Sequence, residues 1–300
     1  MRKEFSGWLE TIAQSRKDLM LLTGDLGFMA LEGVAQVLEK RFVNVGVSEQ
    51  NMMSMAAALA HEGMTPLCYS IAPFAVFRPA EQIRLDICLH NKNVKIVGNG
   101  GGYGYGIMGA THHAIEDLAM LSSFQNMVCY VPFHNGDVAS VCDAMLARKG
   151  PAYLRLGFGV PPVGIISTPY SSIRKIASGH TWTVVGIGPV ILNALRAAHE
   201  LRGGADVFVV SELPCPELSQ DLIESLQRTG KVLIVEEHVE RGGLAEWLCL
   251  MLMKAGLHPQ VWHQCAKGYP DNLYGSQAFH QKQCGLDEKH LLGLMSQSYD

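Results

Sequence analysis

Glu49 stands between an apolar run and an apolar helix, a position where an α/β protein can place a reactive side chain. The stretch RFVNVGVSEQNMMSMAAALAHEG, Arg41 to Gly63, predicts a buried strand over Phe42 to Val45 and a helix over 49–62. On spacing alone Glu49 is also a simple capping acid, because Ser48 suits an N-cap and the helix dipole favours a carboxylate in the first turn. The apolar flanks nevertheless predict a buried carboxylate, which needs a partner.

Two phenylalanines and an arginine follow the next apolar run, in SIAPFAVFRPAEQIR, Ser70 to Arg84. Phe74 and Phe77 are three residues apart beside prolines, which predicts a loop or helix start where rings could line a flat ligand. Two core phenylalanines explain the same spacing, and Arg78 by itself reads as an ordinary surface arginine.

A glycine-rich segment follows another predicted strand and ends in two histidines, in VGNGGGYGYGIMGATHHAIEDLAML, Val97 to Leu121. Its GxGxxG match begins six residues after Gly98, and no acid ends the next strand, so a dinucleotide site is disfavoured. We expect instead a long loop whose backbone can approach a ligand. Adjacent residues do not share a face, so at most one of His112 and His113 should point into a site; a solvated histidine is the alternative for each.

Arg155 ends a predicted strand in PAYLRLG. A guanidinium fork matches a phosphate or carboxylate, so Arg155 could bind an anionic ligand. A salt bridge to a neighbouring helix explains the residue equally well.

The elements that must position these residues alternate between short apolar runs and helical patterns. This alternation predicts an α/β fold of two doubly wound domains with mostly parallel sheets, in which ligands bind beyond the carboxyl ends of the strands. We expect a first domain at 1–156, a linker rich in Pro, Gly and Ser at 157–179, and a second domain at 180–300. Predicted strands lie at 19–23, 42–45, 66–71, 94–98, 127–131, 152–156, 183–188, 206–210 and 231–236. Predicted helices lie at 5–15, 29–40, 49–62, 78–91, 114–122, 136–148, 189–201, 215–228, 243–255 and 288–295.

Composition narrows the classes of function. The 300 residues are 48% apolar and 17% charged, with a net charge of -4 and no basic run, which disfavours nucleic acid as a partner. No signal peptide or membrane span is visible, so we expect a cytoplasmic protein. The eight cysteines stand singly without CxxC spacing, which indicates free thiols rather than disulfides or a metal site.

Taken in order, these motifs resemble the carboxyl-terminal half of transketolases. GVSEQNM, F-x-x-F-R, G-A-T-H-H-x-x-E-D, a strand ending LRLG and finally IVEEHVERGGL occur in the family's order between about Arg2 and Leu257. The resemblance implies a pyrimidine-binding domain followed by the transketolase C-terminal domain. It also implies thiamine diphosphate as cofactor and transfer of a two-carbon ketol unit between sugars or sugar phosphates.

In that family the acid matching Glu49 holds a ring nitrogen of the cofactor's aminopyrimidine and shifts it toward the imino tautomer that removes the reactive proton. The resemblance places Phe74, Phe77 and Arg78 among the cofactor contacts and makes His112 catalytic.

Further family positions imply contacts with the substrate. His112 and His113 would face the reacting sugar, and Arg155 would grip a sugar phosphate. Asp25 and Arg2 match additional substrate or cofactor contacts.

The GDG motif that binds the metal and diphosphate in full-length transketolases does not occur in these 300 residues. The resemblance therefore implies a split enzyme. A separate N-terminal transketolase subunit would hold the diphosphate and its Mg²⁺ or Ca²⁺, this chain would hold no metal, and the assembly would be an α2β2 heterotetramer.

Departures from the family leave the substrate open. Met108, Gly100 and Met29 replace polar residues usual in sugar-phosphate transketolases, which puts ordinary pentose-phosphate substrates in doubt. Other interpretations also remain. A beta subunit of a 2-oxo acid dehydrogenase shares the domains but differs around the histidines, and a 1-deoxyxylulose-5-phosphate-synthase-like enzyme shares Arg78. A non-catalytic binding or regulatory subunit and an NAD-binding protein are weaker alternatives.

Overall fold

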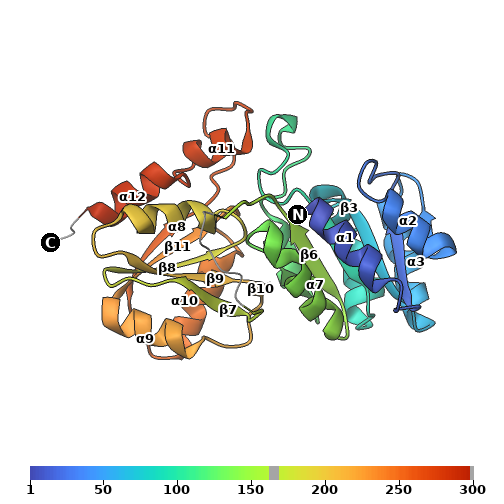
Figure 1. The fold of residues 1–300 in the computed structure, drawn as a ribbon, viewed down its shortest axis with the longest axis horizontal. Helices are drawn as coiled ribbons and strands as arrows, with labels where there is room; N and C mark the ends of the chain where they lie inside the picture. The colour runs from blue at the N-terminus through green and yellow to red at the C-terminus, as the bar shows by residue number, and fades with distance from the viewer. Residues whose placement is uncertain (162–168, 298–300) are drawn as a thin grey trace.

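The computed structural model describes residues 1–161 and 169–297, which form two sheets covered by helices (Figure 1). The first sheet has the order β10-β5-β6-β4-β3-β1-β2, and its first six strands in the chain run parallel. These strands are β1 (Leu19–Thr23), β2 (Phe42–Asn44), β3 (Thr65–Ile71), β4 (Lys95–Asn99), β5 (Val128–Tyr130) and β6 (Ala152–Leu156). Their carboxyl ends therefore meet at one edge, where a parallel sheet places its ligands.

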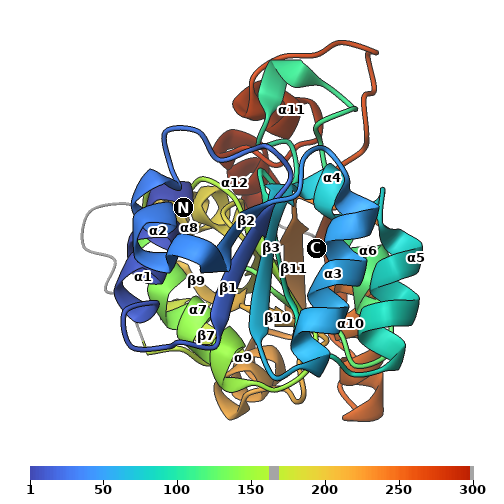
Figure 2. The same cartoon turned by 90° about the vertical axis from the view of Figure 1, so that its right-hand side faces the viewer.

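Helices cover both faces of this sheet (Figure 2). On one face lie α1 (Arg2–Ile12), α2 (Glu32–Leu38) and α7 (Val138–Ala147). On the other lie α3 (Glu49–His61), α4 (Ala72–Val76), α5 (Ala80–Gln82), the π-helical segment Ile83–Leu89 and α6 (Asp117–Ser122). The helix expected at 78–91 is thus a short α-helix continued by a π-helix, whereas α3 begins at Glu49 as expected.

The second sheet has the order β12-β11-β8-β9-β7. Its strands are β7 (Ile173–Ala177), β8 (Trp182–Ile187), β9 (Ala205–Val210), β11 (Lys231–Glu236) and β12 (Gln260–Gln264), and only β7 pairs antiparallel. Its helices are α8 (Ile191–Glu200), α9 (Gln220–Thr229), α10 (Leu244–Lys254), α11 (Gln277–Gln283) and α12 (Glu288–Ser296). The α/β fold with mostly parallel sheets is confirmed.

The local expectations for the linker and for the helix at 215–228 need correction. Residues 173–177, expected in the linker, form β7 at the edge of the second sheet, while 162–168 of that linker lie outside the described residues. The helix expected to start at 215 begins at Gln220. Glu212–Leu213 form β10, which pairs antiparallel with β5 of the first sheet, so the two halves of the chain share a sheet. Long-range edge pairing of this kind leaves no local signal.

All eight cysteines are free thiols, and all except the half-buried Cys249 are buried, as the sequence predicts. Within the described ranges, no helix combines the length and apolarity needed to cross a membrane.

Candidate functional site at the carboxyl edge of the first sheet

Glu49 is the first residue of α3, directly beyond the carboxyl end of β2. Its side chain is 4% exposed, as its apolar flanks predict. Ser48 occupies the N-cap position, but its hydroxyl donates to the carbonyl of Val45 (2.8 Å) and makes no capping hydrogen bond. The turn therefore presents a buried carboxylate at the sheet edge.

The partner of that carboxylate is Arg78. Arg78 Nη1 donates to Glu49 Oε1 at 2.9 Å, and the guanidinium carbon lies 3.9 Å from the centre of the Phe74 ring. Phe74 is on α4, after β3, and Glu49 follows β2, so the ring and the carboxylate come from the ends of two strands that flank β1. A planar group rich in nitrogen thus lies on an aromatic face while it binds a buried acid, an arrangement stabilised by charge and by the ring quadrupole.

His112 continues this cluster from the loop that follows β4. Its ring packs against Phe74 edge-on at 5.2 Å between centroids and against Tyr105 at 5.7 Å. The Thr111 hydroxyl lies 2.9 Å from His112 Nδ1, which orients the imidazole. Asn99, the last residue of β4, donates to the Tyr105 hydroxyl at 2.9 Å. Glu49, Arg78, Phe74 and His112 therefore form one continuous surface.

Tyr105 and Asn99 were missed by sequence reasoning. Asn99 carried a usable signal, since a polar residue at the carboxyl end of a buried parallel strand faces the ligand edge. Tyr105 is hidden among glycines. Burial raises the pKa of its hydroxyl, and the hydrogen bond from Asn99 and the charge of the exposed Arg2 oppose that shift.

Phe77 and Asp25 lie apart from these contacts. Phe77 is 36% exposed, and no ring contact in the described structure joins it to Phe74 or His112. Asp25 follows β1, where its carboxylate accepts from Asn44 Nδ2 at 3.0 Å. It lines a separate cavity of about 240 Å³ with Phe28 and residues of β1, α2 and β2.

His113 points away from His112, as expected for adjacent residues. It is 2% exposed and lies between the Tyr269 hydroxyl (2.9 Å from Nδ1) and the Gly106 carbonyl (2.8 Å from Nε2). Burial lowers its pKa to about 4, so the ring is neutral at pH 7 and Nε2 donates to the carbonyl. His113 thus joins the loop to the second half of the chain, which argues against the expected contact with a sugar.

Arg155 is likewise buried, with 4% exposure, at the junction between the two sheets. Nε donates to Asp117 Oδ2 at 2.8 Å, and Nη2 donates to the carbonyls of Ala114 (2.7 Å) and Glu237 (3.0 Å). Asp117 begins α6, so the alternative interpretation, a salt bridge to a neighbouring helix, describes what the structure contains. This placement argues against a contact between Arg155 and a substrate phosphate.

Residues 1–157 match the model of the transketolase pyrimidine binding domain, and residues 172–284 match that of the transketolase C-terminal domain. The chain is 30% identical over 250 residues to one of the subunits of the apulose-4-phosphate transketolase of Phocaeicola vulgatus, covering 81% of this chain and 80% of that protein. It is 31% identical over 240 residues to 6-deoxy-6-sulfo-D-fructose transketolase subunit SqwH of a Clostridium species, covering 77% and 74%.

Among solved structures, a split gene transketolase described as an inactive beta4 tetramer superimposes with a TM-score of 0.86 and 28% identity, over 98% of this chain and 96% of that one. The match thus extends over both sheets. From these matches, and from the buried acid at the edge of the first sheet, the chain belongs to the transketolase family.

Proposed function

We propose that this chain is the C-terminal subunit of a two-component, thiamine-diphosphate-dependent transketolase, which transfers a ketol unit between sugars or sugar phosphates. The observation that carries the proposal is the position of the Arg78 guanidinium. It donates a hydrogen bond to the buried Glu49 carboxylate and lies over the Phe74 ring. The coarser assignment, a transketolase-type subunit, has the support of relatives that are named as subunits.

The residues present fit the aminopyrimidine of thiamine diphosphate. An aminopyrimidine is planar and rich in nitrogen, as the guanidinium is, and so suits the same acid and the same ring face. Only one hydrogen bond to the Glu49 carboxylate is found among the described residues, so the carboxylate has acceptor capacity to spare. When bound, the cofactor supplies a nucleophilic carbon that can carry a two-carbon unit.

Each residue of the cluster then has a defined task. Glu49 holds a proton at the ring nitrogen of the pyrimidine, and Phe74 supports the ring by stacking. Arg78 must leave Glu49 for the pyrimidine to enter, and its 46% exposed side chain has room to swing outward. His112, with Nδ1 oriented by Thr111, directs Nε2 to the hydroxyl groups of the sugar and can move a proton there.

A partner chain is part of the proposal. Apolar side chains flank the cluster and are strongly exposed, namely Val47 (72%), Ile107 (75%) and Met108 (53%). Large apolar side chains with this exposure beside polar residues are typical of a protein interface. We propose that an N-terminal subunit covers these side chains, holding the diphosphate and its Mg²⁺ or Ca²⁺, in an α2β2 heterotetramer. The similar split transketolase whose beta4 tetramer is inactive supports a need for the second chain.

The remaining expectations stay proposals. We place the first domain at 1–156, begin the second at β7 (residue 173) and not at 180, and place the protein in the cytoplasm. The exposed Met108 and the 91% exposed Met29 favour a substrate less phosphorylated than the pentose phosphates.

The test is to isolate the chain together with its companion subunit and to assay ketol transfer with and without thiamine diphosphate. The complex should transfer the unit, and Glu49→Gln should lower turnover by about 10²- to 10⁴-fold. Glu62→Gln, at the exposed far end of α3, is the matched control and should retain activity. Unchanged turnover in Glu49→Gln, or decarboxylation of 2-oxo acids coupled to lipoyl acceptors, would refute the proposal.

A further inference from the structure

The loop that carries His112, residues 100–113, packs against the C-terminal half of the chain. In both overall views its tip lies beside α11 and the segment before it (Figures 1 and 2). The Tyr103 hydroxyl donates to the carbonyl of Gly268 at 2.8 Å, and the Tyr103 ring stacks on His280 at 4.8 Å between centroids. Much of this glycine-rich backbone therefore approaches the protein's own second half, and its expected approach to a ligand stays a prediction.

Glu237, just beyond β11, lies at the base of this contact. Its carboxylate is buried and accepts from the backbone amide of Tyr103 (2.6 Å), from Gln277 Nε2 (2.9 Å) and from Gln281 Nε2 (2.5 Å). A side chain at Gly102, whose φ is +65°, would place its Cβ 2.3 Å from Glu237 Oε1. The loop thus needs a glycine where this carboxylate touches it, and the carboxylate joins the loop to α11.

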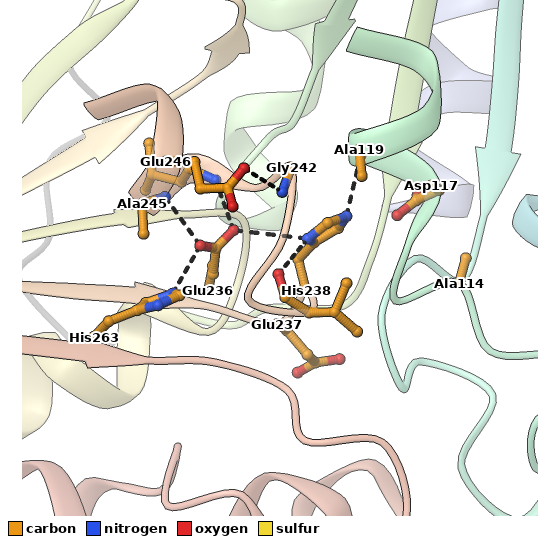
Figure 3. A network of polar contacts seen from close by, with 12 residues as sticks. Ala114, Asp117, Ala119, Glu236, Glu237, His238, Gly242, Ala245, Glu246 and His263 are labelled. Carbon is orange, nitrogen blue, oxygen red and sulfur yellow. Dashed lines mark hydrogen bonds and ion pairs between the residues drawn. The ribbon is translucent and has the colours of Figure 1, made fainter. Parts of the chain in front are cut away.

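The neighbours of Glu237 hold its backbone in place (Figure 3). On one side Glu236 accepts from the amides of Leu244 (2.7 Å) and Ala245 (3.0 Å) at the start of α10. On the other side His238 Nε2 accepts from the amide of Ala119 on α6 at 3.1 Å. The Glu237 carbonyl itself accepts from Arg155. The carboxylate is therefore presented from a turn that is fixed to both halves of the molecule.

We propose that Glu237 is a positioning residue, which holds the loop at Tyr103 and so sets the place of His112 at the carboxyl edge of the first sheet. The loop has a second tie at His113, through Tyr269 and Gly106, directly beside His112. The role of Glu237 in holding the loop, which we call the anchor, rests on these contacts alone. Its expected effect on turnover rests on the proposed function.

The hydrogen-bond pattern defines the test. The Glu237 carboxylate takes part in these hydrogen bonds only as an acceptor. In Glu237→Gln one of its two oxygens becomes an NH₂ group, which would face the donor groups of its partners. Gln281 cannot turn its amide without cost, because its Oε1 already accepts from Asn193 Nδ2 at 3.0 Å. The exchange Glu237→Gln with Gln281→Glu restores these pairings and gives up only the longer contact, 3.2 Å, from Gln277 Nε2 to the second oxygen at position 237. The new amide at position 237 can accept from Tyr103 and donate to the new carboxylate at position 281, which still accepts from Asn193.

Hydrogen–deuterium exchange on the full chain should show amides 100–113 exchanging at least about tenfold faster in Glu237→Gln, with β8 and β9 unchanged. In the complex, kcat should fall on the order of 10²-fold, as expected for a misplaced catalytic group. The double exchange should restore both, and Glu240→Gln, exposed on the same turn, should change neither.

Wild-type protection of the loop in Glu237→Gln would overturn the anchor, as would a double exchange that fails to restore protection. Loss of loop protection in Glu237→Gln, together with a wild-type complex that transfers no ketol unit, would refute the proposed function and leave the anchor standing.

Discussion

Two of the arginine–carboxylate pairs in the first half of the molecule differ in their surroundings. Arg78 and Glu49 meet at 2.9 Å at the open sheet edge, where the arginine is 46% exposed. Arg155 and Asp117 meet at 2.8 Å at the junction of the sheets, where they are 4% and 0% exposed. The Tyr153 hydroxyl also donates to Asp117 Oδ2, at 2.7 Å.

The comparison separates a pair that can open from one that cannot. Water reaches Arg78, so its guanidinium can leave Glu49 and be hydrated, and the buried carboxylate can then bind another group. Arg155 donates hydrogen bonds to Asp117 and to two backbone carbonyls. Because the site is buried, water cannot take the place of these partners. The same residue types thus make an exchangeable site in one place and a permanent joint in the other.

The largest effect is expected for Arg155→Met. Removing the guanidinium leaves the Asp117 carboxylate buried without its counter-charge, so the free energy of unfolding should fall by about 3 to 5 kcal/mol. Urea denaturation would measure the loss. Adding Asp117→Leu removes the stranded charge and should recover part of it. A loss in Arg155→Met as small as that of an exposed pair would contradict the idea of a permanent joint.

The adjacent histidines should separate activity from stability. His112→Ala should lower kcat/KM of the complex by about 10²-fold, because a positioned proton-transfer group is lost. It should leave thermal unfolding nearly unchanged. His113→Ala removes the link between Tyr269 and Gly106 and should lower the midpoint of thermal unfolding instead. Equal effects of the two variants on unfolding would show that His112 is also part of the joint.

Lys95 is a buried cation whose hydrogen-bond partners are backbone carbonyls and not a carboxylate, which adds a third case to the comparison. It donates to the carbonyls of Arg148 and Gly150, both at 2.8 Å, and burial lowers its pKa from the usual 10.5 to about 7. The unfolded chain therefore binds the proton more tightly, and stability should rise as pH increases from about 7 toward 10.5. The rise should be about 1 kcal/mol between about pH 7 and 8. Urea titrations across this range should show a flatter profile for Lys95→Met.

A smaller effect than that of Arg155→Met is expected for Arg78→Met. Water reaches the arginine but Glu49 is buried, so the free energy of unfolding should fall by about 1 to 2 kcal/mol when the carboxylate loses this partner. Urea denaturation of Arg78→Met and Arg155→Met under the same conditions would compare the contributions of the two pairs directly. A loss comparable to that of Arg155→Met would mean that Arg78 is structural and cannot make room for a ligand.

The sequence by itself determined the alternation of strands and helices and the place of Glu49. Period, apolar runs and cap residues are local properties, so the strand ends, the start of α3 at Glu49 and the free cysteines could be predicted from it. The order of the motifs also pointed to the family. At the site, Glu49, Phe74, Arg78 and His112 were identified and are brought together.

Only the tertiary structure decided which polar residues face a ligand and which hold the halves of the chain together. Arg155 and His113 were expected at the substrate, yet their partners lie 38 and 156 residues away in the chain and bury them. Glu237 meets Tyr103 across 134 residues, and β10 crosses into the first sheet. Such pairings depend on how separate elements pack, and a local pattern of residues carries no record of them.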